Sequence, residues 1–236
     1  MKIIVPDYYS GFKCSMGACR HTCCADWEVD IDEESLSRFQ DFPDIVKHID
    51  ENETPHFRLT ENERCPFLNE SGLCDMILAH GEDILCQTCR DHPRFRNFWS
   101  DRTEIGLGLV CEEACRLILT RPEPMKLITL SDDGKDDDLP EDEVWLMQLR
   151  DSLWENITAT GIEARLREYL IFRHLPDALY DGLLDERIAF IHSAAEKITS
   201  AWSKTDGSFE AIIEATRAWS YDVEYDDEVL EKKIRG

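Results

Sequence analysis

The chain has 236 residues, of which 42% are hydrophobic and 32% are charged, a balance that excludes a disordered chain. No apolar run approaches the roughly 18 residues of a membrane-spanning helix, and no signal-like apolar core opens the sequence, so we expect a cytoplasmic protein that does not enter membranes. The 50 acidic residues against 26 basic ones give a net charge of −24. Such a chain repels phosphate backbones, which argues against nucleic acid as a partner and favours a basic protein surface.

The first half of the chain predicts short elements separated by turns. We expect a helix over 33–39 capped by Asp30 or Asp32, short strands at 57–60 and 65–68, and helical turns at 73–79 and 84–90. A hairpin of strands 95–99 and 103–110 follows, and then a helix over 112–119. Elements this short bury little apolar area, so we expect a metal to cross-link them.

An acidic run at 131–143 predicts a linker, because its eight acidic residues, glycine and proline solvate the chain. Beyond it, apolar residues recur at helical spacing and predict helices near 144–157, 162–174, 176–184, 186–202, 209–221 and 227–234. The sequence therefore predicts an α+β protein with three parts: a cysteine-rich, metal-stapled module of short strands and helices at 1–130, the linker at 131–143, and a mostly α-helical region at 144–236.

The cysteines are concentrated in one half of the chain, where all ten fall within the first 115 residues. Disulfides need an oxidising compartment, so clustered thiolates at this density favour metal binding, with redox-active dithiols and plain buried cysteines as alternatives. The spacings point the same way without choosing between zinc and iron–sulfur. They are Cys14-x4-Cys19-x3-Cys23-Cys24, Cys65-x8-Cys74, Cys86-x2-Cys89 and Cys111-x3-Cys115. The C-x3-C-x2-C pattern of radical enzymes fails, because position 26 is Asp26.

Several of these segments carry a resemblance to a known family. They are Phe12-Lys13-Cys14, His21-Thr22-Cys23-Cys24-Ala25-Asp26-Trp27, Cys65-Pro66-Phe67-Leu68, Gly72-Leu73-Cys74 and Thr88-Cys89-Arg90. Together they resemble the flagellin lysine-N-methylase (FliB-like) family, and more broadly the CxxxCxxCC group of zinc- or iron-chelating proteins. The resemblance is strong over about 3–119. Beyond the linker it rests on 169–176 and 223–226.

The resemblance implies a protein-lysine N-methyltransferase that acts on flagellin lysines, uses S-adenosylmethionine as donor and carries an iron–sulfur cluster, 4Fe-4S in the first place and zinc as the alternative. It also implies a ligand set, because eight cysteines match the family's positions: Cys14, Cys19, Cys23, Cys24, Cys65, Cys74, Cys89 and Cys111. Cys86 falls where the family more often has serine, and Cys115 where it has alanine. Typical members are longer than this chain, which bears most on substrate recognition.

Two arginines that follow Cys89, Arg90 and Arg94, are candidates for binding a cofactor or substrate carboxylate, with salt bridges on the acidic surface as the alternative. Methylation needs a neutral lysine amine and therefore a proton acceptor. The sequence assigns no catalytic residue, and Gly106-Leu-Gly108 is too weak a pattern for a donor-binding loop. The alternative function is a non-catalytic zinc- or iron-binding module with a structural, storage or docking role.

Overall fold

The computed structural model describes residues 1–134 and 138–236 and confirms the predicted α+β fold, with short strands in the first half and helices beyond. The chain divides into two compact units. Residues 14–92 form a cysteine-rich unit, and residues 1–13 together with 93–236 form a sheet-and-helix unit. Neither predicted boundary, at 130 or at 143, coincides with a boundary between these units. Part of the predicted linker, residues 135–137, lies outside the described residues.

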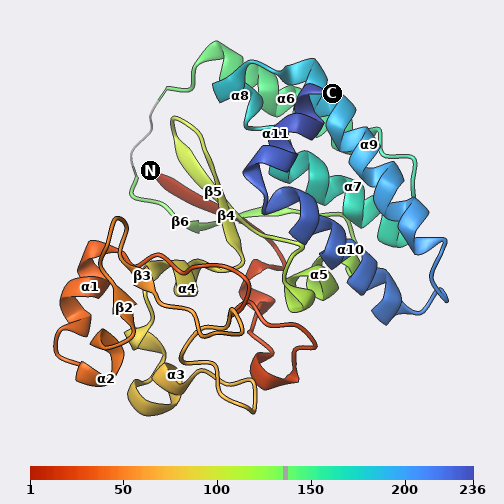
Figure 1. Cartoon of the computed structure of the whole chain (residues 1–236). Coiled ribbons are helices and arrows are strands. Elements are labelled where there is room, and N and C mark those ends of the chain that lie inside the picture. Colours follow the sequence, from red (N-terminus) through yellow and green to blue (C-terminus); the bar gives the residue numbers. More distant parts are fainter. Residues whose placement is uncertain (135–137) are drawn as a thin grey trace. The chain divides into compact units, whose positions relative to one another are not determined.

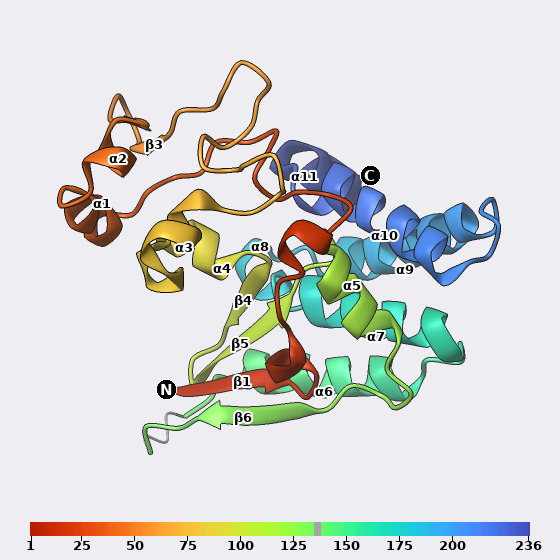
Figure 2. The same ribbon diagram turned by 90° about the horizontal axis from the view of Figure 1, so that it is seen from below.

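A four-stranded sheet underlies the sheet-and-helix unit, in the order β4-β5-β1-β6. The predicted hairpin is present as β4 (Arg94–Phe98) and β5 (Arg102–Leu107), which pair antiparallel. Strand β1 (Lys2–Pro6) runs parallel to β5, and β6 (Leu127–Ser131) runs antiparallel to β1 (Figure 2). The sequence analysis did not predict β1 and β6, since each is a single short run whose partner lies far along the chain.

In the described residues of this unit, seven α-helices accompany the sheet, and each overlaps a predicted helix, although α6 begins three residues earlier than predicted, inside the expected linker (Figure 1). They are α5 (Glu112–Leu119), α6 (Glu141–Glu155), α7 (Gly161–His174), α8 (Ala178–Asp181), α9 (Leu184–Trp202), α10 (Phe209–Glu224) and α11 (Asp227–Arg235). Helix α7 contacts α5, α6 and α9 and has buried side chains on all sides, as expected of a helix inside a core. No helix within the described ranges is long and apolar enough to span a membrane.

The face of the sheet that carries Phe95 and Asn97 packs against α7. The Phe95 ring meets the rings of Tyr169 and Phe172 at centroid distances of 6.1 and 5.7 Å, and the Asn97 side-chain amide donates to the backbone carbonyl of Phe172 at 2.8 Å. The residue paired with Phe95 on β5 is Gly106, and a Cβ there would lie 2.2 Å from the Phe95 ring. Glycine at 106 is therefore required for this packing.

A buried ion pair fixes α6 against the same face of the sheet. Both carboxylate oxygens of Glu104 on β5 accept from the guanidinium of Arg150 on α6, at 2.6 and 3.0 Å. Glu104 is 0% exposed and Arg150 is 3% exposed. The guanidinium also lies between the rings of Trp99 and Trp154, at 5.3 and 5.0 Å. The bidentate geometry and the aromatic walls together compensate a charge that would otherwise be costly to bury.

We expect Arg150→Ala to lower the free energy of unfolding by about 3–5 kcal/mol, because it leaves the Glu104 carboxylate buried without its partner. The matched control is Arg167→Ala, which breaks the half-exposed Glu163–Arg167 pair on α7 and should cost less than about 1 kcal/mol. Urea denaturation followed by circular dichroism measures both. Equal losses in the two variants would contradict the role given to the buried pair.

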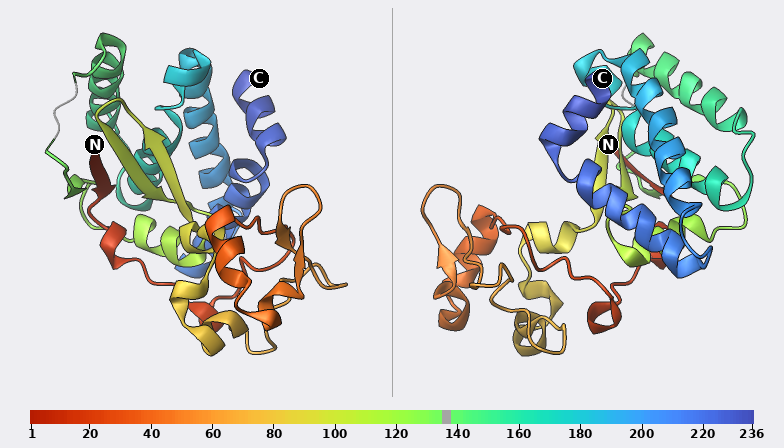
Figure 3. Two further views of the ribbon diagram at one scale, coloured as in Figure 1. Left: turned by 90° about the vertical axis from the view of Figure 1, so that its left-hand side faces the viewer. Right: turned by 45° about the vertical axis from the view of Figure 1, so that its right-hand side comes forward.

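The cysteine-rich unit has short elements joined by long irregular stretches (Figure 3). Helix α1 (Glu33–Phe39) has the predicted bounds and is capped by Asp32, whose carboxylate accepts from the Ser35 N–H at 2.9 Å. The other elements are α2 (Pro43–Val46), β2 (Ile49–Asp50), β3 (His56–Phe57), α3 (Asp75–His80) and α4 (Gln87–Asp91). The strand expected at 65–68 is reduced to an isolated bridge between Leu68 and Cys74.

Aromatic side chains give the cysteine-rich unit a core of its own. The rings of Phe39, Phe57 and Phe67 are packed in a row, with centroids 5.9 and 5.2 Å apart. Phe39 and Phe57 are almost completely buried. The structure does not show the metal cross-link that the sequence predicts. The aromatic core supplies part of the stabilisation that the short elements alone would lack.

Candidate functional site

Five of the ten cysteines gather in the cysteine-rich unit, beside the aromatic core. Cys65 and Cys86 are buried within that core, at 9% and 0% exposure, and Cys24, Cys74 and Cys89 pack against it half-buried. Their thiols are close enough to act on one another electrostatically, since charge on Cys24, Cys74 and Cys86 raises the pKa of Cys65. We call this group the thiol cluster.

Backbone contacts position the members of the cluster. The Cys65 N–H donates to the Cys24 carbonyl at 2.8 Å, and this hydrogen bond joins the two chain segments that carry these residues. A tight turn follows, in which the Asn69 side chain accepts from the backbone of Ser71 and Leu73. A Cβ at Gly17 would lie 2.6 Å from the Ser71 carbonyl, so the first cysteine loop can approach this turn only with glycine there.

The pKa values of the thiols in the cluster are shifted in opposite directions. A hydrogen bond with Cys23 is the main cause that lowers the pKa of Cys24 to about 7, and the hydroxyl of Thr22 acts in the same direction. Burial raises the pKa of Cys65 to about 12. In the Cys86-x2-Cys89 pair, the hydrogen bond between the two thiols lowers the pKa of Cys86 and raises that of Cys89.

The other four cysteines of the predicted ligand set are not members of the thiol cluster, although Cys23 is hydrogen-bonded with Cys24 at its edge. Cys14, Cys19 and Cys23 belong to a loop around a 3₁₀ turn at Met16–Ala18, where Cys14 and Cys23 are exposed. Cys111 belongs to the sheet-and-helix unit, at the start of α5. Among the residues that the structure describes, no three His, Cys, Asp or Glu side chains are arranged to hold a metal ion. The eight-cysteine ligand set therefore stays a prediction.

The two cysteines outside that set have different surroundings. Cys86 is a member of the thiol cluster, and its C-x2-C spacing from Cys89 is the sequence signal that indicated it. Cys115 is buried in the helical core, with its sulfur 3.9 Å from the carbonyl of Ile213 on α10. Cys115 is thus a packing residue, while Cys86 has the surroundings of the matched cysteines.

The two predicted cofactor-binding arginines belong to different units. Arg90 is exposed on α4 of the cysteine-rich unit. Arg94 begins β4 in the other unit, where its Nε donates to the Tyr9 hydroxyl at 2.8 Å and its guanidinium lies over the rings of Tyr9 and Phe12. The Arg94 side chain is therefore already engaged by aromatic partners.

A second polar group, which sequence reasoning did not identify, is buried among the helices. The Glu224 carboxylate on α10 accepts from the Tyr169 hydroxyl at 3.0 Å, from His174 Nε2 at 2.8 Å and from the Ser220 hydroxyl at 2.5 Å. The two chain stretches with the C-terminal resemblance, 169–176 and 223–226, meet here. Their shared resemblance was the signal that could have indicated the group.

The charges in this group follow from its hydrogen bonds. Burial alone would raise the pKa of Glu224, but its hydrogen bond and charge interaction with His174, with smaller contributions from Arg173 and Ser220, outweigh burial and hold that pKa below its usual value. Burial lowers the pKa of His174. The Nε2 atom of His174 faces Glu224, and its Nδ1 is buried without a hydrogen-bond partner in the described chain. A fully buried group of this kind orders α7 and α10 and is closed to a macromolecular substrate.

The glycines of Gly106-Leu-Gly108 both serve close packing. Gly106 admits the Phe95 ring, and a Cβ at Gly108 would lie 2.5 Å from the Tyr225 hydroxyl. Gly108 also donates its N–H to the Pro93 carbonyl at 2.7 Å. These positions explain the glycines without a donor-binding loop, in agreement with the weakness of the sequence pattern.

Comparison with known proteins gives three similar sequences. Lysine-N-methylases of Salmonella typhimurium and Salmonella choleraesuis are each 28% identical to this chain over 138 residues, which cover 52% of this chain and 33% of the relative. The chain resembles lysine-N-methylases. It is also 25% identical over 134 residues to the flagellar biosynthetic protein FliU of Salmonella muenchen, covering 52% of this chain and 79% of that relative.

These matches cover only part of this chain and part of each relative. The chain spans about a third of the length of the lysine-N-methylases that it matches. No family model matches the chain, and no solved structure matches it. The expected resemblance to FliB-like proteins is thus confirmed as a similarity over half of the chain, while nothing in these comparisons supports the wider CxxxCxxCC group.

We expect the thiols of the reduced, metal-free protein to differ in their reaction with iodoacetamide, because the thiolate is the nucleophile. Cys24 should reach half of its maximal rate near pH 7, whereas Cys65 should stay unlabelled through the neutral range. Peptide mass mapping after timed labelling measures both, and Cys23→Ala should move the midpoint of Cys24 to higher pH. A common midpoint for Cys24 and Cys65 in the folded protein would contradict these pKa shifts.

Proposed function

We propose that this chain is a protein-lysine N-methyltransferase that acts on flagellin. The observation that supports the proposal is the 138-residue similarity to the two lysine-N-methylases, together with the flagellar name of the third relative. The charge of the chain is consistent with it. A protein of net charge −24 attracts lysine-bearing surfaces and raises their rate of encounter.

The donor that we propose is S-adenosylmethionine. In the transfer, the neutral lysine nitrogen attacks the methyl carbon, the carbon–sulfur bond of the sulfonium breaks, and a proton leaves the nitrogen. Exposed carboxylates of this chain would orient the incoming ammonium and accept its proton. Tyr8, a neighbour of the first cysteines in sequence, is poorly suited to that task, because burial raises its pKa well above the usual value.

We propose further that thiols of the cysteine-rich unit bind iron–sulfur or zinc. The donor chemistry fits, since thiolates are the ligands that both prefer. The described positions do not form a finished site, because no three ligands converge. Binding would therefore require side chains of the thiol cluster to rearrange.

The second candidate function is a metal-binding module without catalysis. The gathering of Cys24, Cys65, Cys74, Cys86 and Cys89 around a small core favours it, and so does the short coverage of the lysine-N-methylases. Anaerobic purification identifies the metal, because a brown protein with broad absorption indicates an iron–sulfur cluster and a colourless protein with stoichiometric zinc indicates a zinc site. Methylation and donor binding by the loaded protein then separate the two candidates.

We expect Cys24→Ala to lose most of the bound metal and Cys115→Ala to keep it, since Cys24 belongs to the thiol cluster and Cys115 packs among helices. Cys86→Ser, at a position where the FliB-like family more often has serine, should lower the metal content because the Cys86 thiol lies within the cluster. Metal analysis after anaerobic reconstitution measures all three. Full metal content in Cys24→Ala would refute metal binding by this cluster.

We expect metal-loaded protein with S-adenosylmethionine to add methyl groups to the lysines of its host's flagellin, seen as whole-methyl increments by intact-mass spectrometry. The rate should fall as salt rises, because attraction between exposed charges is screened over about 8–10 Å at physiological ionic strength. Flagellin whose lysines have been acetylated is the control and should gain nothing. Fully loaded protein that neither methylates flagellin nor binds the donor by calorimetry would leave the metal module as the function.

A further inference from the structure

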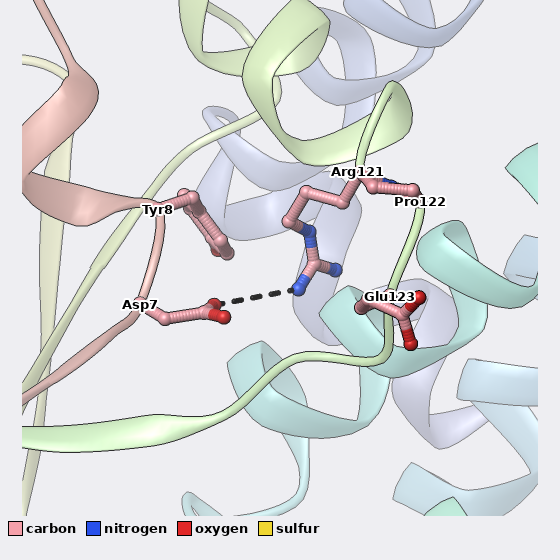
Figure 4. Close-up of a pocket in the computed structure, with 5 residues that line it drawn as sticks. All are labelled: Asp7, Tyr8, Arg121, Pro122 and Glu123. Atoms are coloured by element: carbon pink, nitrogen blue, oxygen red, sulfur yellow. Dashed lines mark ion pairs between the residues drawn. The ribbon is translucent and has the colours of Figure 1, made fainter.

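A small pocket lies in the sheet-and-helix unit, where the chain leaves β1 and where it leaves α5. Its volume is about 260 Å³, and it is lined by Asp7, Tyr8, Arg121, Pro122 and Glu123 (Figure 4). The first two residues follow β1 and the other three follow α5. Two backbone segments far apart in sequence therefore bring two carboxylates, a phenol and a guanidinium around one space.

The Arg121 side chain is fixed at the pocket by several contacts, and only 9% of its surface is exposed. Its Nε donates to the carbonyl of Ile118 at 3.1 Å, its Nη2 donates to Glu168 at 2.9 Å, and its guanidinium lies 4.7 Å from the centre of the Tyr8 ring. The other terminal nitrogen, Nη1, is buried and has no hydrogen-bond partner in the described chain. Its nearest counter-charge is the Asp7 carboxylate, at 4.0 Å.

Next to the pocket, but not lining it, a second arginine competes with Arg121 for the same buried carboxylate. Glu168 on α7 pairs with Arg121 and also with Arg165, at 2.9 Å each, and accepts from the Met125 N–H at 3.1 Å. Two guanidinium groups therefore share one buried carboxylate. The Tyr8 hydroxyl is likewise buried without a hydrogen-bond partner in the part of the chain that the structure describes. Two donors are thus left unsatisfied, which is costly unless a ligand pairs with them.

The rim of the pocket has the opposite charge. Asp7 and Glu123 are exposed acidic residues, and Figure 4 shows the Asp7 carboxylate directed toward the guanidinium from the side of β1. A simple anion would meet repulsion from these two carboxylates, whereas a cation alone would leave the buried donors unpaired. A group with a carboxylate beside an ammonium satisfies both parts. The volume, below the roughly 300–1,000 Å³ of pockets for drug-sized ligands, suits a head group of that size.

We propose that this pocket binds the zwitterionic α-amino-acid group of a small ligand. The ligand carboxylate pairs with Arg121 Nη1 and the Tyr8 hydroxyl, and the ammonium lies between Asp7 and Glu123. Admitting the carboxylate requires the exposed Asp7 side chain to turn away from Arg121, 4.0 Å away, and from the Lys126 N–H, whose hydrogen bond it accepts at 3.4 Å. Two sources carry this chemistry, a free amino acid and the amino-acid end of a sulfonium methyl donor. The second source rests on the proposed methyltransferase function.

Titration calorimetry of the full chain tests the proposal with L-methionine and S-adenosylhomocysteine as probes, and with acetate and methylamine as single-charge controls. We expect the zwitterions to bind and the single charges to bind at least tenfold more weakly. Tyr8→Phe should weaken binding about tenfold. The same variant should leave the denaturation midpoint unchanged or raised, because it removes an unpartnered buried hydroxyl. Glu123→Gln should also weaken binding, and Tyr221→Phe, at an exposed tyrosine on α10, should change neither property.

The outcomes separate this site from the proposed function. Binding of L-methionine without S-adenosylhomocysteine supports the pocket with a free amino acid as its ligand. Methylation of flagellin by Tyr8→Phe, with unchanged affinities for both the donor and L-methionine, would overturn the pocket and leave the methyltransferase function standing. Absence of binding by both zwitterions to the wild-type chain would overturn the pocket outright, whatever the methylation assay gives.

Discussion

In the described part of this protein, three buried glutamates are each held by hydrogen-bond donors from another element, and the helical packing depends on that constraint. Glu104, Glu168 and Glu224 are each nine-tenths or more buried. Glu104 joins the sheet to α6 through Arg150, and Glu224 joins α10 to α7 through Tyr169 and His174. Because an uncompensated buried charge costs several kcal/mol, these pairings tolerate few alternative arrangements of the same helices. They specify the packing more than they add to its net stability.

The helices of the second half were predictable because their signals are local. Apolar residues at helical spacing identify a segment such as 162–174 without knowledge of its neighbours. Strand β1 gave no comparable signal, because Lys2 pairs with Arg102 and the pairing is visible only in three dimensions. The strand expected at 65–68 was wrong for a related reason: the Asn69 side chain closes a turn that ends the extended run after a single bridge.

The sequence predicted that the candidate site is built of thiols, but it did not predict which cysteines lie together. Density and spacing of cysteines indicated a thiol site, and the structure gathers five of them around one small core. Family positions counted Cys111 in and Cys86 out, yet Cys111 belongs to the sheet-and-helix unit and Cys86 to the thiol cluster. The position of a cysteine in the family's pattern does not predict to which structural unit that cysteine belongs. The Glu224 group gave no such chemical signal, since its members are ordinary polar residues of the helices α7 and α10.

The distribution of charge implies that salt affects two binding events differently: the encounter with a lysine-bearing protein and the binding of a small zwitterion at Arg121. Paired acids occupy the core, so most of the −24 net charge lies on the surface, where it attracts a lysine-bearing protein through a field that salt screens. The pocket at Arg121 instead presents one buried positive group behind two exposed carboxylates. A zwitterion has no net charge, so the long-range field neither attracts nor repels it, and its binding depends on the local donors. Salt therefore acts on the encounter with a basic protein and leaves the small ligand largely unaffected, which makes the two events separable in one preparation.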